Sequence, residues 1–374
     1  MLTQHPRDQK QLLLGALMRE LYNVRMKPIG VLFLLFLFGC AAPLTNSIAP
    51  APTLVAPAST SPTRSASTPT RSVPLETLPV PPTQTRSTKP TNQPTNQPTT
   101  QPTNQPTPQP RDPVIVGAGD IAVCNASGDE ATAQLLDKID GAIFTLGDNV
   151  YPNGSPEQFQ NCYDPTWGRF KARTYPAPGN HDYNTAGAKG YYGYFGARAG
   201  DPTQGYYSYD VGAWHIIVLN SEIDTGENSA QGQWLRDDLQ KHPASCTLAM
   251  FHRPLFSSGP HGDDDSGAKT RPLWDVLYQN NADVILNGHD HDYERFAPQD
   301  PNGKADAQRG IREFVVGTGG AAPYVFRVIK PNSEKRIAGA FGVLKLTLHA
   351  TSYDWEFVSV APLLFHDSGT SVCH

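Results

Sequence analysis

The feature that most restricts the fold is a short apolar run that ends in a glycine and a carboxylate. Residues 142–146 read as a buried strand, and the pentapeptide that follows places Asp148 and Tyr151 next to turn residues. We expect both side chains on the loop that leaves the C-terminal end of this strand. Such loops commonly carry the active sites of α/β proteins, and a carboxylate and a phenol can both bind a metal.

A second apolar run, residues 114–116, leads to Asp120 in the same way. Between the two runs, a helix from Asp129, which could cap it, to about Ile139 completes a predicted βαβ unit. This unit places Asp120 and Asp148 side by side at one edge of a sheet. Adjacent buried carboxylates repel each other unless a cation compensates, so the pair indicates a metal site.

Two further segments deliver ligand-type side chains at a turn and at a strand end. An Asn-His-Asp sequence beginning at Asn180 follows a proline-stiffened approach, and an asparagine oxygen can bind a hard cation. His252 follows the predicted strand at 246–251. The glycine-rich loop beyond it carries His261, which could reach into a cleft, whereas the acidic run 263–265 reads as a solvated cluster and is assigned no role.

A pair of histidines follows the predicted strand at 282–286. His289 and His291 are two positions apart, so on an extended segment both side chains point the same way, which suits two ligands of one centre. The flanking carboxylates, Asp290 and Asp292, can orient the two imidazoles from behind.

The order of the elements predicts an α/β or α+β domain. Strands and helices alternate in the first half, where further elements are expected at 214–220 (strand), 231–242 (helix) and 270–279 (helix). The tail is strand-rich, and its strands are assigned to a second sheet with the last two as a hairpin: residues 314–316, 341–348 and 353–360. Periodicity alone distinguishes no finer class.

The N-terminal region indicates export. A mostly apolar run of about eleven residues is too short for an ordinary membrane span, and Leu37–Cys40 resembles a bacterial lipobox. We therefore expect residues 1–40 to be a signal peptide whose true start is Met26 or Met18, with lipid attached to Cys40. The alternative is an uncleaved N-terminal anchor. Both place the rest of the chain outside the cytoplasm, at the cell envelope or the extracellular face.

Residues 41–112 are rich in proline, threonine, serine and glutamine, and they cannot bury enough apolar surface to fold. They are predicted to be a disordered linker, extended by its prolines to a reach of well over ~50 Å. Residues 113–374 are predicted to form one catalytic domain. The net charge of −5 comes without a basic stripe, which argues against nucleic acid as the main partner.

Four cysteines remain once Cys40 is set aside, and an even number in an exported chain favours disulfides. Three pairings are possible. Cys124 with Cys162 is favoured because both follow candidate metal-bearing strand ends, which leaves Cys246 to hold Cys373. A thiolate metal site is disfavoured because no Cys-x-x-Cys spacing occurs.

In their order along the chain, these motifs resemble those of the calcineurin-like metallophosphoesterases: GD at Asp120, GDxxY from Gly147, GNHD from Gly179, His252 and GHxH from Gly288. Most members of that superfamily have a histidine two residues after the first aspartate, where this chain has Ala122. The tyrosine of GDxxY compensates for its loss, and GHDHDYER from Gly288 is similar to the GHxHxYER of plant purple acid phosphatases. The N-terminal β-sandwich of those plant enzymes has no counterpart in the linker.

The resemblance implies a four-layer α/β/β/α sandwich with two metal ions at strand ends, bridged by Asp148. One ion would have four ligands: Asp120, Asp148, Tyr151 and His291. The other would also have four: Asp148, Asn180, His252 and His289. Phenolate and carboxylates suit Fe(III), and an amide with imidazoles suits Fe(II), Zn(II) or Mn(II).

The resemblance also implies attack of a metal-bound hydroxide on phosphorus. His181 matches the family residue that contacts phosphate or protonates the leaving group, and His261 is a further candidate for that proton. The leading hypothesis is an exported phosphomonoesterase, tethered by lipid, that acts on phosphate-ester small molecules. A phosphodiesterase on the same metals is the first alternative, and a non-catalytic tethered binding module is the second.

Overall fold

The computed structural model describes residues 111–361 and 366–374. The expected signal peptide, Cys40 and almost all of the expected linker lie outside the described residues. Within the described ranges, no helix is both long enough and apolar enough to cross a membrane.

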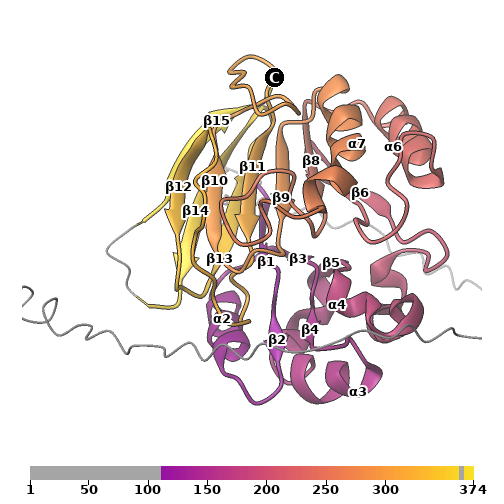
Figure 1. The fold of residues 1–374 in the computed structure, drawn as a ribbon, viewed down its shortest axis with the longest axis vertical. Helices are drawn as coiled ribbons and strands as arrows, with labels where there is room; N and C mark the ends of the chain where they lie inside the picture. Colours follow the sequence, from indigo (N-terminus) through magenta and orange to yellow (C-terminus); the bar gives the residue numbers. More distant parts are fainter. Residues whose placement is uncertain (1–110, 362–365) are drawn as a thin grey trace, which may run out of the picture. The chain divides into compact units, whose positions relative to one another are not determined.

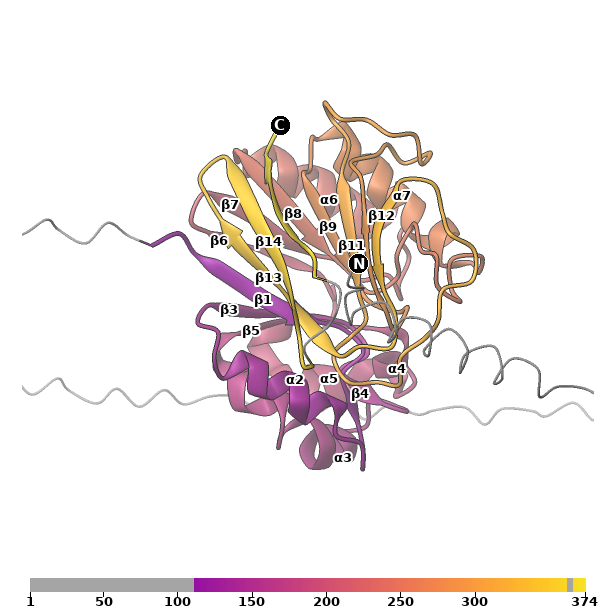
Figure 2. The ribbon, with the colours of Figure 1, turned by 90° about the vertical axis from the view of Figure 1, so that its left-hand side faces the viewer.

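Two mixed sheets pack face to face and are covered by helices on both outer sides (Figures 1 and 2). The first sheet has six strands, in the order β15 (Ser368–Val372), β14 (Ser352–Ser359), β13 (Gly342–Leu348), β1 (Val114–Ala118), β3 (Ala142–Leu146) and β5 (Thr174–Ala177). The second has seven, in the order β12 (Ser333–Ile337), β10 (Tyr293–Phe296), β11 (Arg312–Val316), β9 (Val284–Asn287), β8 (Cys246–Met250), β7 (Trp214–Val218) and β6 (Tyr207–Val211). The predicted α/β/β/α sandwich is confirmed.

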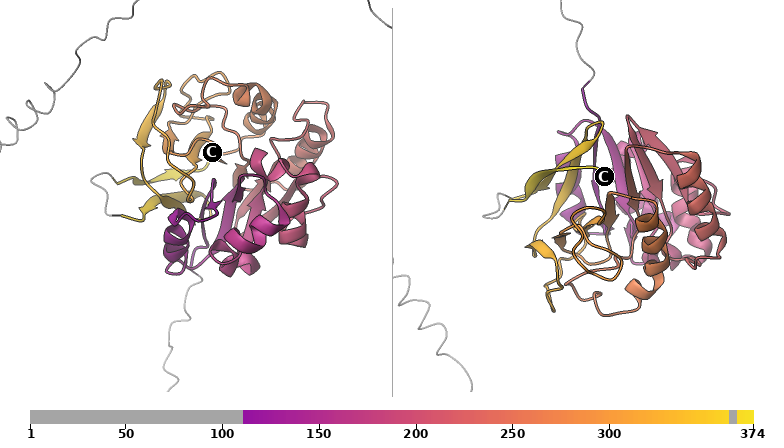
Figure 3. Two further views of the ribbon diagram at one scale, coloured as in Figure 1. Left: turned by 60° about the horizontal axis from the view of Figure 1, so that its bottom comes forward. Right: turned by 90° about the horizontal axis from the view of Figure 1, so that it is seen from above.

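The helices divide between the two outer sides (Figure 3). The six-stranded sheet is accompanied by α2 (Gly128–Leu136), α3 (Pro156–Gln158), α4 (Asn180–Tyr183) and α5 (Lys189–Phe195), and the seven-stranded sheet by α6 (Ala230–Lys241) and α7 (Ser266–Gln279). Short 3-10 turns at 167–173, 186–188 and 196–199 and a π-helical turn at 159–163 complete the described helical segments.

The central strands of the seven-stranded sheet are buried on both faces. In β7 and β8, Ile216 and Leu248 belong to the apolar core shared by the two sheets. Their neighbours Ile217 and Ala249 pack instead with Leu235, Trp274 and other side chains of α6 and α7. A parallel strand covered on both sides reads as a continuous apolar run, which is why these strands were visible in the sequence.

The predicted βαβ unit forms, with β1 parallel to β3, and β5, which was not predicted, continues the sheet on the other side of β3. The loops after β1 and β3 also remain paired: the amides of Asp120 and Ile121 donate to Gly147 and Asp148, and the short strands β2 (Ala122–Val123) and β4 (Val150–Tyr151) follow. The two loops therefore leave the sheet side by side.

The assignment of the C-terminal hairpin to the second sheet is wrong. Strands β13 and β14 do form a hairpin, but β13 pairs antiparallel with β1, with Val116 opposite Lys345. The alternating pattern of β14 shows that one face is buried, but it does not say which sheet offers a free edge. The open side of β1 supplies that edge.

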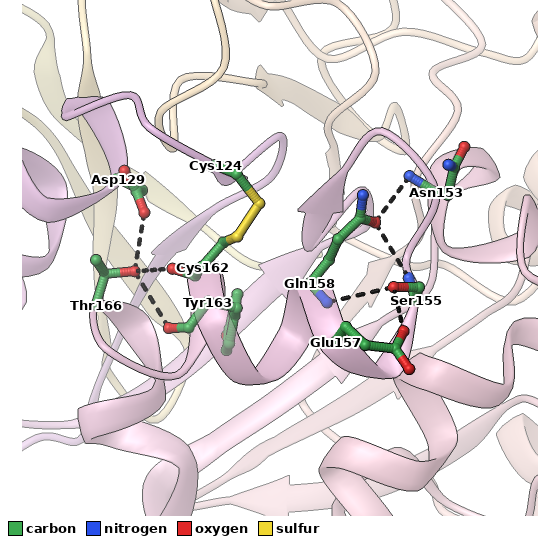
Figure 4. The surroundings of a disulfide bond; sticks show 9 residues. All are labelled: Cys124, Asp129, Asn153, Ser155, Glu157, Gln158, Cys162, Tyr163 and Thr166. Carbon is green, nitrogen blue, oxygen red and sulfur yellow. Dashed lines mark hydrogen bonds between the residues drawn. A yellow bond between two sulfur atoms is a disulfide. The ribbon is translucent and has the colours of Figure 1, made fainter.

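Two helix starts also differ from the sequence prediction. Asp129 does not cap α2, because the N-cap position is Ser127 and the Asp129 carboxylate instead accepts a hydrogen bond from the Thr166 hydroxyl (Figure 4). Helix α7 begins at Ser266, four residues before the predicted start at Thr270.

Two disulfides link distant segments. Cys124, just after β2, pairs with Cys162 in the π-helical turn (Figure 4), and Cys246, at the start of β8, pairs with Cys373 beside the C-terminus. The structure thus contains the pairing that the sequence favoured among three.

Candidate metal centre

The loops at the C-terminal ends of β1, β3, β5, β8 and β9 meet where the two sheets adjoin. The amide of His289 donates to Asp120 Oδ2 at 2.8 Å, and the amide of His181 donates to Asp148 Oδ1 at 2.7 Å. Backbone donors from one loop therefore fix the carboxylates of another, and the remaining carboxylate oxygens face a shared interior.

The first set of donor atoms surrounds the hydroxyl of Tyr151. This oxygen lies 2.7 Å from Asp120 Oδ1, 3.0 Å from Asp148 Oδ2 and 3.0 Å from His291 Nε2. Asp120 Oδ1 and His291 Nε2 are 3.3 Å apart. All four side chains are at least nine-tenths buried.

The second set surrounds Nε2 of His252, which is itself fully buried. This nitrogen lies 3.3 Å from Asp148 Oδ2, 3.0 Å from Asn180 Oδ1 and 3.1 Å from His289 Nδ1. Asp148 Oδ2 belongs to both sets, so the two sets share one oxygen, as expected for a bridging carboxylate.

These separations fit coordination to common cations. Donors bound at about 2.1 Å to one ion lie roughly 3 to 3.4 Å from one another, whether the geometry is octahedral or tetrahedral. The donor set also fits chemically: the first group has two carboxylates, a phenol and an imidazole, and the second adds an amide oxygen and two imidazoles. The residues present therefore suit two neighbouring metal ions.

The carboxylates and the phenol of the first set differ in how readily they lose a proton. Burial raises the pKa of Asp120 and Asp148, but the imidazoles of His291 and His252 outweigh this effect and keep both pKa values below the usual range. Burial and the two carboxylates raise the pKa of Tyr151 well above its ordinary value. The phenol therefore becomes an anionic ligand only when a metal stabilises it.

Backbone carbonyls orient two of the imidazoles. Nδ1–H of His252 donates to the carbonyl of Leu146 at 2.8 Å, and Nδ1–H of His291 donates to the carbonyl of Ala322 at 2.8 Å. Because each Nδ1 proton is held by a carbonyl, Nε2 is the nitrogen that faces the donor set in both rings, and it would bind a metal once it has lost its own proton.

The expectation that His289 and His291 lie on an extended segment is wrong. They occupy a curled loop between β9 and β10, where Asp290 N bonds to Gly288 O and Asp292 N to Asp290 O, and His289 has a φ of 72°. The two rings consequently use different nitrogens and enter different donor sets. The Asp290 carboxylate accepts hydrogen bonds from the Ser257 hydroxyl and the His261 amide, and so holds the loop that carries His261. The His291 ring is oriented by the carbonyl of Ala322 and not by a flanking carboxylate.

Two motif glycines allow close approach between the ligand loops. A Cβ on Gly179 would lie 2.3 Å from the Asp148 amide nitrogen, and one on Gly288 would lie 2.6 Å from Asp120 Oδ2. Asp120, Asp148 and His289 also adopt positive φ, which costs free energy for residues other than glycine and is concentrated at functional sites.

The two histidines predicted to handle protons both lie at the edge of the centre. His181 donates from Nδ1 to the Pro152 carbonyl at 2.7 Å, and its Nε2 is 3.9 Å from Asp148 Oδ2. His261 donates from Nδ1 to Asp264 Oδ2 at 2.8 Å, and its ring centroid is 4.1 Å from that of His289. Each side chain is about one-third exposed.

Sequence reasoning missed several supporting residues. Asp264, assigned to a solvated cluster, contacts both His261 and His289, and Arg253 pairs with Glu222 at 2.8 Å while its NH1 lies 3.1 Å from His289. No spacing rule relates these residues, because the loop after His252 brings them together only in three dimensions.

Asp182 is also a supporting residue rather than a ligand. Its carboxylate accepts hydrogen bonds from the Gly179 amide at 2.9 Å and the Asn149 side chain at 3.0 Å. Burial, together with the nearby charge of Asp148, raises its pKa to about 7. Asp182 thereby ties the Asn180 loop to the loop that carries Asp148.

Comparison with known proteins agrees with this geometry. Residues 113–293 match the family model described as calcineurin-like phosphoesterase. The chain is 30% identical over 155 residues to purple acid phosphatase 23 of Arabidopsis thaliana, a match covering 37% of this chain and 34% of that protein. It is 28% identical over 204 residues to the probable purple acid phosphatase 20 of the same plant, covering 48% and 45%. The chain thus spans less than half the length of these relatives.

Among solved structures, purple acid phosphatase PPD1 from yellow lupin (Lupinus luteus) has a similar fold. The superposition has a TM-score of 0.54 at 22% identity and covers 70% of this chain and 54% of that one. All residues of the two donor sets lie within the matched family segment. Residues 113–293 therefore form a calcineurin-like phosphoesterase domain.

Proposed function

We propose that this protein is an exported two-metal phosphoesterase, and specifically a phosphomonoesterase similar to the purple acid phosphatases. The observation that carries the proposal is the pair of donor sets that share Asp148 Oδ2, with His181 and His261 at their edge. The similarity to named purple acid phosphatases supports it.

The first donor set, which contains the phenol of Tyr151, would hold Fe(III), and the second would hold Fe(II), Zn(II) or Mn(II). When bound, the two cations supply Lewis acidity and lower the pKa of coordinated water. The chain's own contribution is to hold four of the seven donors in place, through the backbone amides on Asp120 and Asp148 and the carbonyls on His252 and His291.

The two edge histidines would contact the phosphate ester. Each has its Nδ1 proton committed to an acceptor, so each presents Nε2 to the substrate. A protonated Nε2 can donate a hydrogen bond to a phosphate oxygen or a proton to the departing alkoxide. The Asp264 carboxylate accepts the Nδ1 proton of His261 and so fixes the orientation of that ring.

The test compares the metal-loaded protein on p-nitrophenyl phosphate and on bis-p-nitrophenyl phosphate. We expect faster hydrolysis of the monoester, and we expect Asp148→Asn to lower kcat/KM by about 10³-fold or more because both donor sets lose the shared oxygen. Asp237→Asn, on the exposed side of α6, is the matched control. Equal activity of the Asp148→Asn variant would overturn the proposal, and a preference for the diester would replace it with a phosphodiesterase.

Export is the second part of the proposal. The lipobox-like sequence at Leu37–Cys40 and the proline-rich stretch after it motivate it. The two disulfides support it, because such bonds persist mainly in oxidising compartments. The membrane contact proposed is the lipid on Cys40 alone.

A further inference from the structure

A hollow of about 450 Å³ adjoins the metal centre on the side of the loop at 321–330. Six residues line it: Pro260, His261, Pro323, Tyr324, Val325 and Arg327. Two of these touch ligand rings directly. The Tyr324 ring is stacked on His291 with centroids 4.0 Å apart and planes at 7°, and His261 packs on His289. The hollow therefore opens beside one imidazole of each donor set.

Backbone hydrogen bonds hold this loop in place. The amide of Ala321 donates to Asp120 O at 2.9 Å, that of Tyr324 to His291 O at 2.8 Å, and that of Arg327 to Ser258 O at 2.8 Å. The wall is thus fixed to the same segments that carry the candidate ligands, and a group bound there has a defined position relative to the metals.

The surface of the loop is unusually apolar for an exposed segment. Val325, Val328 and Ile329 are 71%, 56% and 51% exposed, and they are three of the five exposed large hydrophobic residues in the described part of the chain. A cluster of exposed apolar side chains next to a reaction centre indicates a ligand with an apolar part. Tyrosine and proline rings favour a flat, aromatic one.

Arg327 adds a charge requirement. Arg327 lines the hollow, and its guanidinium has no hydrogen-bond or ion-pair partner among the described residues. Arg253, by contrast, is paired with Glu222. An unpaired guanidinium beside an aromatic wall suits a carboxylate or a second phosphate on the bound group.

We infer that this hollow binds the leaving group of the substrate, and that the preferred substrates are phosphate monoesters of aromatic alcohols that carry a second anionic group. The inference rests on the proposed phosphoesterase function. In the reaction, water supplies the oxygen to phosphorus, the P–O bond to the aromatic alcohol breaks, and the alcohol departs from the hollow with the proton it gains.

The test uses three esters: ethyl phosphate, phenyl phosphate and 4-carboxyphenyl phosphate. Tyr324→Ala should lower the ratio of kcat/KM for phenyl over ethyl phosphate by roughly tenfold. Arg327→Gln should lower the ratio for 4-carboxyphenyl over phenyl phosphate by roughly threefold to tenfold. Because each ratio is compared between a variant and the wild type, the intrinsic reactivity of each ester cancels. Arg236→Gln, on α6, is the control that should leave both ratios unchanged.

A binding measurement separates this inference from the function it rests on. Calorimetry should show that phenylphosphonate binds more tightly than methylphosphonate, and that Tyr324→Ala removes the difference. Because Arg327 does not touch His291, its variant remains informative even if Tyr324→Ala loses metal. If the protein hydrolyses p-nitrophenyl phosphate but both ratios are unchanged in the two variants, the inference about the hollow is overturned and the proposed function stands. Preferential binding of phenylphosphonate without turnover of any ester supports the pocket and overturns the proposed function.

Discussion

The hydroxyl of Tyr151 lies 2.7 Å from Oδ1 of Asp120, so a metal bound by one of them is within reach of the other. A phenolate bound to Fe(III) absorbs visible light, and we expect the iron-loaded protein to be coloured. Tyr151→Phe should bleach the band, keep the far-ultraviolet circular dichroism and weaken iron retention. Tyr324→Phe, which keeps a ring beside His291, is the control and should stay coloured. An iron-replete wild type with no visible band, or an unchanged spectrum in the variant, contradicts the ligand assignment.

Gly179→Ala should loosen the metal centre without a change of charge. The added methyl would lie 2.3 Å from the amide nitrogen of Asp148, so the two loops must separate. We expect a stability loss of about 1–3 kcal/mol and at least ~10-fold weaker metal binding, measured by urea unfolding and by competition with a chelator. Gly193→Ala in α5 meets nothing within 4 Å and should instead stabilise by about 0.5–1 kcal/mol. Equal effects at both positions would refute the packing argument.

The two disulfides should have separable roles. Loop entropy predicts stabilisation of about 4 kcal/mol for the separation of 38 residues between Cys124 and Cys162, and about 5 kcal/mol for the 127 between Cys246 and Cys373. The first bond lies directly after β2, whose partner β4 contains Tyr151. Replacing Cys124 and Cys162 by alanine should therefore lower metal affinity, whereas replacing Cys246 and Cys373 should lower stability alone. Non-reducing peptide mapping tests the pairing first, and free thiols in exported protein would refute it.

His215 should make stability depend on pH at a distance from the metals. The ring is buried, and it lies 2.8 Å from Asp210 on β6 and 2.9 Å from Asp238 on α6, with His242 stacked on it. Burial lowers the pKa of His215, but hydrogen bonds to the two carboxylates outweigh it, and the net pKa is raised above 6.5. The stabilisation is therefore complete below pH 6.5 and is lost as pH rises through the folded-state pKa.

The measurement is the free energy of unfolding in urea from pH 6 to pH 9. His215→Asn should cost about 1–3 kcal/mol at pH 6, because two carboxylates lose a charged donor, and less at pH 9. His366→Asn, at an exposed position, is the control and should leave the pH profile unchanged. A cost of His215→Asn that stays constant over this range would show that the imidazole does not change its protonation state between pH 6 and pH 9, and would contradict the prediction.

Cys40→Ser should abolish incorporation of labelled fatty acid and release the protein from the membrane fraction. The expectation follows from the lipobox-like sequence that ends at this cysteine. Ser47→Ala, in the region after Cys40, is the control and should keep the label. Persistent label in Cys40→Ser, or wild-type protein that remains in the cytosol, would show that the chain is not a lipoprotein.

The parts of the fold visible in the sequence are those with local causes. Strands β3 and β8 are largely apolar runs because both their faces are buried, and a ligand-type residue follows each run, Asp148 after β3 and His252 after β8. The partner of β13 was not visible, because hydrogen bonding between strands is made by backbone groups that are the same in every residue. The edge strands β6 and β15 have no fully buried residues, and their sequences show no clear pattern.

In the candidate metal centre, too, the sequence predicts what is local and misses what depends on the tertiary structure. Every residue assigned as a ligand by resemblance lies in one of the two donor sets, because the motifs record residue types at fixed positions on short loops. The orientation of His289 and the contact of Asp264 with His261 depend on how loops curl, which no spacing records. The motif glycines also indicate which loops approach each other: Gly179 and Gly288 each lack a Cβ at the point where a candidate ligand from another motif lies.

The pairing of β1 with β13 has a consequence for biogenesis. The strand that leads to Asp120 lies near the start of the domain, yet one of its two neighbours is made only after residue 341 has been synthesised. Until then, the first strand has an open edge, and the loop carrying a metal ligand is supported on one side. We therefore expect a chain that ends before β13 to bind metal ions more weakly than the full chain, because the Asp120 loop then lacks the support of this neighbour.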